Sequence, residues 1–171
     1  MSFERHLDRP SIDPANAAAA KGLCPVSGLA ATTEVLTRDG YRPADRLKPG
    51  MDVITRDRGM RRILAVSEDT ARSRIVCFHA HALSEDIPDQ DLLLPARQAV
   101  LVRDWRAQAM FGRHEARVPA AALIDEEFIT DAGMAEGAWV QIWLDQPSVL
   151  YARGLEVLSA HLFDAQMQPA L

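Results

Sequence analysis

The sequence predicts an all-β fold with many short strands joined in hairpins. Two observations lead to this prediction: short runs rich in β-branched and apolar residues recur along the chain, and turn-forming residues separate them. The chain has 171 residues, which is enough for one domain with a buried core and too few for two large ones. We expect one β body with one or two short helical turns, preceded by an N-terminal arm.

The first 26 residues differ from the rest of the chain. They are polar and interrupted by prolines, and the alanine run at 17–20 has high helix propensity but no amphipathic face of large side chains. We expect residues 1–26 to form an extended arm, either a flexible tail or a segment that becomes ordered on a partner. The β body is expected at 27–160 and a C-terminal tail at 161–171.

Turn signals and β-prone runs predict the individual elements of the body. Turn sequences at 38–40 and 56–59 each end in glycine, and each separates two β-prone runs, which indicates consecutive hairpins. Proline begins two short segments, 43–47 and 119–124, that are expected to form single helical turns. The expected strands are 34–37, 51–55, 60–67, 75–82, 92–94, 99–102, 139–144 and 149–152.

Composition excludes several classes of function. A formal net charge of −5 argues against nucleic acid as a partner, because phosphate backbones are bound by clustered positive charge. Cys24 and Cys77 are the only cysteines, too few for a disulfide scaffold. No secretory signal or apolar span for membrane insertion is visible, so we expect a cytoplasmic protein, or one exported without a Sec signal. No motif indicates a cofactor, and a small-molecule substrate is not expected.

Four segments carry a resemblance to a known family. They are 28–57, which opens Gly-Leu-Ala-Ala-Thr-Thr-Glu-Val-Leu-Thr, then a central block at 91–101, a Val-Pro-Ala stretch at 118–125, and a late block at 139–155. In this order and spacing they are similar to the Hint (hedgehog/intein) family, in its bacterial, alphaproteobacterial branch. The resemblance covers about residues 28–158. It implies a disc-like all-β body with pseudo-twofold symmetry.

The Hint reaction implied by this resemblance is a self-cleavage. A Cys or Ser at the first position of the domain attacks the carbonyl of the preceding peptide bond, and a central-block His protonates the departing amide nitrogen. Here the first position falls on Gly28 and the His position on Gln98, while a late-block His position falls on Gln141. None of these side chains can supply the chemistry. We therefore expect a catalytically degenerate domain, a pseudo-enzyme that acts as a non-enzymatic protein-binding or assembly module.

An autoprocessing function is the alternative. Ser27 or Cys24 could attack its own preceding bond, with self-cleavage near residues 24–28 through an N–O or N–S acyl shift. This hypothesis needs a histidine, such as His79 or His81, to be placed nearby by the fold.

Two further pairs of residues are candidates for binding. His79 and His81 are two apart in an expected strand, so they would share a face and could chelate a metal, with Glu85 or Asp86 as a third ligand. Trp139 and Trp143 are four apart, so they also share a face, which is either core or an exposed anchor for a protein partner or for self-assembly. Cys77 is expected to be a small buried apolar residue.

Overall fold

A computed structural model describes residues 26–160 of the chain. The predicted tail at 161–171 and all but the last residue of the predicted arm lie outside the described residues. The elements are β1 (Leu29–Ala30), β2 (Glu34–Thr37), β3 (Gly40–Pro43), η2 (Ala44–Arg46), β4 (Asp52–Thr55), β5 (Gly59–Arg62), β6 (Ala65–Phe78), β7 (Leu92–Pro95), β8 (Ala99–Val102), α2 (Trp105–Phe111), β9 (Ala116–Pro119), η3 (Ala120–Leu123), β10 (Ile129–Trp143), β11 (Val149–Ala152) and β12 (Leu155–Leu158). The predicted all-β fold is confirmed.

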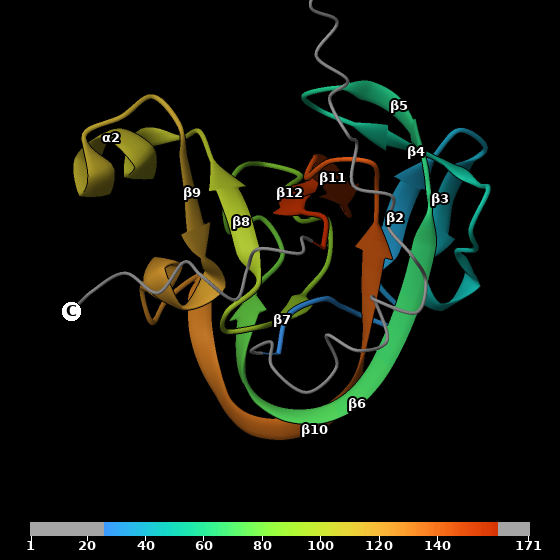
Figure 1. The fold of residues 1–171 in the computed structure, drawn as a ribbon. Coiled ribbons are helices and arrows are strands. Elements are labelled where there is room, and N and C mark those ends of the chain that lie inside the picture. The colour runs from blue at the N-terminus through green and yellow to red at the C-terminus, as the bar shows by residue number, and fades with distance from the viewer. Residues whose placement is uncertain (1–25, 161–171) are drawn as a thin grey trace, which may run out of the picture.

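The strands form two sheets. One is four-stranded, in the order β1-β10-β6-β7, and the other is eight-stranded, in the order β3-β2-β4-β11-β12-β8-β9 with β5 paired to β4. The two longest strands, β6 and β10, pair antiparallel from Phe78 opposite Ile129 to Ala65 opposite Trp143. Figure 1 shows this long ribbon curving beneath the remaining strands. Apolar side chains from both sheets make one core, in which Phe78, Leu94 and Leu155 are fully buried.

Both predicted hairpin turns are present and are closed in the same way. Thr37 Oγ1 donates to the carbonyl of Gly40 at 2.6 Å, and Thr55 Oγ1 donates to that of Gly59 at 2.6 Å. Gly40 and Gly59 have φ of +98° and +66°, a region that glycine enters without a steric penalty. The glycines identified in the sequence therefore end these turns for a conformational reason.

Both ends of the body lie against β10. Leu29 of β1 pairs with Val140. At the other end, Ala160 forms a parallel bridge with Trp143 and donates its N–H to the carbonyl of Ile142 at 2.9 Å. The described chain thus begins and ends beside the same stretch of one strand.

Several predicted elements differ from the structure. The expected strand 60–67 is divided between β5 and the start of β6, and the expected strand 75–82 ends at Phe78. The first ten residues of β10, 129–138, and the helix α2 were not expected. Much of β10 in that part is exposed and small or polar, so it lacks the apolar alternation that marks a half-buried strand. Within residues 26–160, no helix is long and apolar enough to cross a membrane.

The sequence contains capping residues at both ends of the helix α2. Asp104 is its N-cap, accepting from the N–H of Arg106 at 2.9 Å, and Gly112 ends it with φ of +64°. An aspartate before and a glycine after a short segment are the usual signs of helix termini. The buried guanidinium of Arg106 also donates to the carbonyl of Ala82 at 3.0 Å, which ties the helix to the loop after β6.

Candidate functional site

The start of the body is held by a contact between residues distant in sequence. The backbone N–H of Gly28 donates to Gln98 Oε1 at 2.8 Å, in a buried position and across 70 residues of chain. Gly28 lies just before β1, and Gln98 just before β8. The structure therefore brings together the two positions that the resemblance identified as nucleophile and acid.

The Gln98 side chain is fixed from both ends of its amide. Its Nε2 donates to the carbonyls of Ala99 and Leu158, each at 3.0 Å, while its Oε1 accepts from Gly28. The residue is 4% exposed. Both donors and the oxygen of the amide are thus used in a buried network, which holds the carbonyl oxygen against the N–H of Gly28.

The backbone at Gly28 excludes a side chain. Its φ is +124°, and a Cβ placed there would lie 2.8 Å from the carbonyl oxygen of Val140 and 3.3 Å from the Gln141 side chain. Contacts of a Cβ with a backbone oxygen at that distance require the strand to shift. Glycine is therefore needed at this position both for its conformation and for the close approach to β10.

The residue before Gly28 is bound by the third degenerate position. Gln141 Nε2 donates to Ser27 Oγ at 3.1 Å and to the Ser27 carbonyl at 3.4 Å, while Gln141 Oε1 accepts from Ser67 Oγ at 3.4 Å. Two glutamines thus contact the 27–28 dipeptide from β10 and from the segment before β8. Cys24, the other proposed nucleophile, lies outside the described residues.

A family model described as a Hint domain matches residues 27–164. This chain belongs to the Hint domain family. The match includes the 27–28 dipeptide, Gln98 and Gln141, so the positions described above are part of the Hint domain. No curated protein matches the chain.

Solved structures confirm the Hint fold. A DnaB intein from Synechocystis sp. PCC 6803 is similar with a TM-score of 0.55 and 7% identity, covering 80% of this chain and 100% of its own. A bacterial intein-like domain from Clostridium thermocellum is similar with a TM-score of 0.53 and 13% identity, over the same shares of the two chains. At such identities the likeness concerns the fold alone.

The two histidines proposed as a metal pair do not share a strand in this Hint domain. Because β6 ends at Phe78, the alternation that would have placed His79 and His81 on one face does not extend to them. His81 has φ of +66°, and its Nδ1 contacts the carbonyl of Glu85 in the following loop. The prediction that one strand carries both histidines is therefore wrong.

His79 lies instead in a cluster that sequence reasoning missed. Its Nδ1 is 3.7 Å from Cys77 Sγ and 3.2 Å from Asp91 Oδ2, and its Nε2 is 3.0 Å from Thr130 Oγ1. Burial, followed by the nearby Asp91 charge, raises the pKa of the Cys77 thiol. The N–H of Ala80 and then His79 lower the pKa of Asp91. The cluster thus combines a buried thiol, an imidazole and an ionised carboxylate.

The tryptophans proposed as interaction anchors are buried. Trp139 and Trp143 are 5% and 4% exposed, and their indole N–H groups donate to the carbonyl of Ala71 at 3.1 Å and to Ser67 Oγ at 3.2 Å. The anchor role is therefore wrong for both, and the alternative of core residues holds. The exposed tryptophan is Trp105, at 69%, whose ring is stacked under Arg106 at 4.9 Å.

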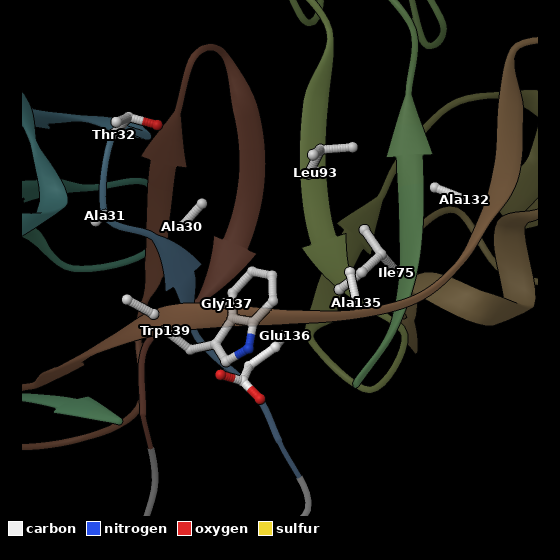
Figure 2. A pocket seen from close by; sticks show the side chains of 11 residues that line it. Ala30, Ala31, Thr32, Ile75, Leu93, Ala132, Ala135, Glu136, Gly137 and Trp139 are labelled. Atoms are coloured by element: carbon white, nitrogen blue, oxygen red, sulfur yellow. The ribbon is translucent and has the colours of Figure 1, made fainter. Parts of the chain in front are cut away.

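An open pocket of about 360 Å³ lies beside Trp139. Figure 2 shows the indole between the side chains of β1 and those of Ile75 and Leu93. Its wall is mostly alanine and glycine, so the surface is shallow and apolar. The lining residues are Ala30, Ala31, Thr32, Ile75, Leu93, Ala132, Ala135, Glu136, Gly137, Ala138 and Trp139.

Proposed function

We propose that this Hint domain is catalytically inactive and acts as a non-enzymatic protein-binding or assembly module. The observation that carries the proposal is the hydrogen bond from the N–H of Gly28 to Gln98 Oε1, at 2.8 Å. In the Hint reaction this nitrogen belongs to the bond that breaks, and it must receive a proton as it leaves. Here it faces an amide oxygen, which accepts a hydrogen bond and has no proton to give.

The missing groups remove both halves of the first step. Gly28 has no side chain that could attack the carbonyl of Ser27, so no ester or thioester can form there. A general acid contributes roughly two to four orders of magnitude in rate, and Gln98 cannot act as one near neutral pH. The Gln98 contact further stabilises the intact peptide group, because its oxygen accepts the N–H of that amide at 2.8 Å.

The contacts of Ser27 do not support the alternative of autoprocessing. The Ser27 hydroxyl accepts from Gln141 Nε2 at 3.1 Å, and an amide N–H directed at the hydroxyl oxygen engages a lone pair without removing the proton. His79 contacts Thr130, whereas Ser27 contacts Gln141. The two contacts lie at opposite ends of β10, about 36 Å apart when measured along the curved strand at about 3.3 Å per residue. Within residues 26–160, no histidine is hydrogen-bonded to Ser27 or Gly28.

Intact-mass measurement tests the loss of self-cleavage. We expect the freshly purified full chain to keep its whole mass after incubation with a thiol and, separately, with hydroxylamine, because no ester or thioester is present for either reagent to intercept. A catalytically active intein treated in parallel confirms that the reagents work. Release of an N-terminal fragment ending at Leu23 would identify Cys24 as a nucleophile, and one ending at Val26 would identify Ser27; either would overturn the proposal.

The pocket beside Trp139 supports the binding half of the proposal. It is apolar and open, and Leu93 at its edge is 46% exposed. Its apolar lining and the exposed Leu93 side chain beside it offer another protein chain a place to pack. A protein segment is a better match than a small polar ligand, because the lining offers few hydrogen-bonding side chains.

Sedimentation velocity over a range of protein concentrations tests assembly through this surface. We expect the weight-average sedimentation coefficient to rise with concentration, and Leu93→Glu to abolish the rise by placing a charge at the edge of the pocket. Leu64→Glu is the matched control, because Leu64 is 44% exposed and does not line the pocket. A parent chain that stays monomeric throughout would rule out self-assembly, and an equal effect of both variants would rule out this surface.

A further inference from the structure

Three potential metal ligands converge at one end of the β6–β7 pair. The ligand atoms of Cys77, His79 and Asp91 all lie within 4.8 Å of one another. Cys77 is buried, whereas the side chains of His79 and Asp91 are 41% and 60% exposed. The cluster thus has one buried side formed by the thiol and one side open to solvent.

The sheet register explains why these three residues meet. β6 pairs antiparallel with β7 from Ile75 opposite Pro95 to Phe78 opposite Leu92. One further step of the same register places His79 opposite Asp91. Cys77 lies two residues before His79, and its Sγ is 3.7 Å from His79 Nδ1. On its other flank Cys77 is paired with Thr130 of β10. The cluster is therefore built by the strand pairing of the fold.

The two separations from His79 Nδ1 are close to the edges of a metal coordination tetrahedron. Typical bonds of Zn²⁺ are about 2.3 Å to sulfur and about 2.0–2.2 Å to nitrogen and oxygen, which place ligands about 3.5 Å apart for sulfur and nitrogen and about 3.4 Å for nitrogen and oxygen. The observed distances from His79 Nδ1 are 3.7 Å to Cys77 Sγ and 3.2 Å to Asp91 Oδ2. The remaining separation, between the thiol sulfur and the carboxylate, is at most 4.8 Å against about 3.6 Å in such a tetrahedron, so the two side chains would close toward a bound ion.

The hydrogen bonds around the cluster orient its ligand atoms. Thr130 Oγ1 lies 3.0 Å from His79 Nε2. With an ion bound, Thr130 Oγ1 would accept the Nε2–H of the neutral imidazole, and the Nδ1 lone pair would face the ion. The N–H of Ala80 donates to Asp91 Oδ1 at 2.9 Å and so leaves Oδ2 toward the same point. Partners of this kind outside the ligand set are typical of metal sites.

The same geometry argues against a nucleophile relay. In a Cys-His-Asp relay, the nucleophile and the carboxylate contact opposite nitrogens of the imidazole. Here both Cys77 Sγ and Asp91 Oδ2 face Nδ1, while Nε2 faces Thr130. Convergence on one nitrogen suits a shared cation and does not suit proton transfer through the ring.

We propose that Cys77, His79 and Asp91 form a zinc site with three protein ligands and a fourth position open to water. A thiolate, an imidazole and a carboxylate together suit Zn²⁺ and Co²⁺, whereas Mg²⁺ and Ca²⁺ require oxygen ligands. Binding releases the proton of the Cys77 thiol to solvent and forms the bond from sulfur to the metal. The site is independent of the proposed loss of self-cleavage, since it lies at the other end of β10 from Gln141.

Cobalt titration of the full chain tests the proposal. The experiment uses a Cys24→Ser background, in which Cys77 is the sole cysteine. We expect one equivalent of Co²⁺ to give a thiolate-to-cobalt charge-transfer band together with intense visible bands of tetrahedral cobalt, both displaced by Zn²⁺. Cys77→Ser should abolish the charge-transfer band, and Asp91→Asn should weaken Zn²⁺ binding in calorimetry by at least about 10-fold.

Matched variants separate this site from nonspecific binding. His79→Gln should abolish stoichiometric binding, whereas His81→Gln, which changes a histidine in the adjacent loop, should leave the affinity and spectrum unchanged. Thr130→Val should weaken binding by about 10-fold while keeping the charge-transfer band, as expected of a positioning residue. Circular dichroism of each apo variant verifies its fold. Absence of the charge-transfer band in the parent, equal affinity in Cys77→Ser, or loss of binding in His81→Gln would overturn the assignment.

Discussion

Replacing Gly28 with alanine is expected to lower the free energy of unfolding by about 3 kcal/mol or more. An L-residue forced to adopt a glycine conformation costs about 1–3 kcal/mol, and φ at Gly28 is +124°. The new Cβ would also lie 2.8 Å from the carbonyl oxygen of Val140. Either β1 moves away from β10, or the variant retains a repulsive contact. Urea denaturation measures the loss as a lower midpoint with an unchanged slope.

Gly40→Ala is the matched control for this substitution. Gly40 has φ of +98° and nothing within 4 Å of a built Cβ, so its replacement reports conformational strain alone, about 1–2 kcal/mol. The difference between the two variants measures the collision with β10. Equal losses at both positions would contradict the close approach described here. The Cβ of a cysteine at position 28 would meet the same carbonyl oxygen of Val140. Because the thiol could not then be seated at the start of β1, we expect the double variant Gly28→Cys, Gln98→His to keep its whole mass in the intact-mass measurement.

Replacing Gln98 with leucine is expected to cost about 3 kcal/mol. The substitution keeps a side chain of similar size but makes it apolar, and it removes the partners of the Gly28 N–H and of the Ala99 and Leu158 carbonyls. A buried polar group left without a partner costs about 1–3 kcal/mol, and the N–H of Gly28 is the most affected because it can donate only once. The shift in the urea midpoint measures this cost.

Gln141→Leu is the control for the glutamine substitution. Gln141 is half-buried, and its bonds to Ser27 and Ser67 are longer, at 3.1–3.4 Å. Because solvent can replace these bonds, we expect a loss below about 1 kcal/mol. If Gln98→Leu cost no more than Gln141→Leu, the buried network at the start of the body would not contribute as argued.

Local sequence signals predicted the parts of the fold that depend on local physics. Glycines at 40 and 59 end hairpin turns because their φ values are positive. The β-prone runs at 34–37, 99–102 and 149–152 correspond to strands with those bounds. The long ribbon was harder to predict, because much of 129–138 is exposed and has no apolar alternation. Its strand structure depends on pairing with β6, which is a tertiary effect.

The two candidate sites differed in how far sequence could predict them. The resemblance to the Hint family identified Gly28 and Gln98 as related positions, and they are in contact. Nothing in the chain related Cys77 to Asp91, because their proximity requires the β6–β7 register. For the tryptophans, the sequence spacing correctly placed Trp139 and Trp143 on one face of a strand. It could not show whether that face is buried, because burial depends on how β10 packs.

The placement of both ends of the body against β10 has an architectural consequence. Leu29 pairs with Val140, and Ala160 bridges to Trp143, so the two ends are about 10 Å apart along a strand that rises about 3.3 Å per residue. A host protein could therefore carry this body within a surface loop, with little separation forced between the two flanks. Circular permutation by a short linker from 160 to 28 would likewise preserve every strand pairing of the domain.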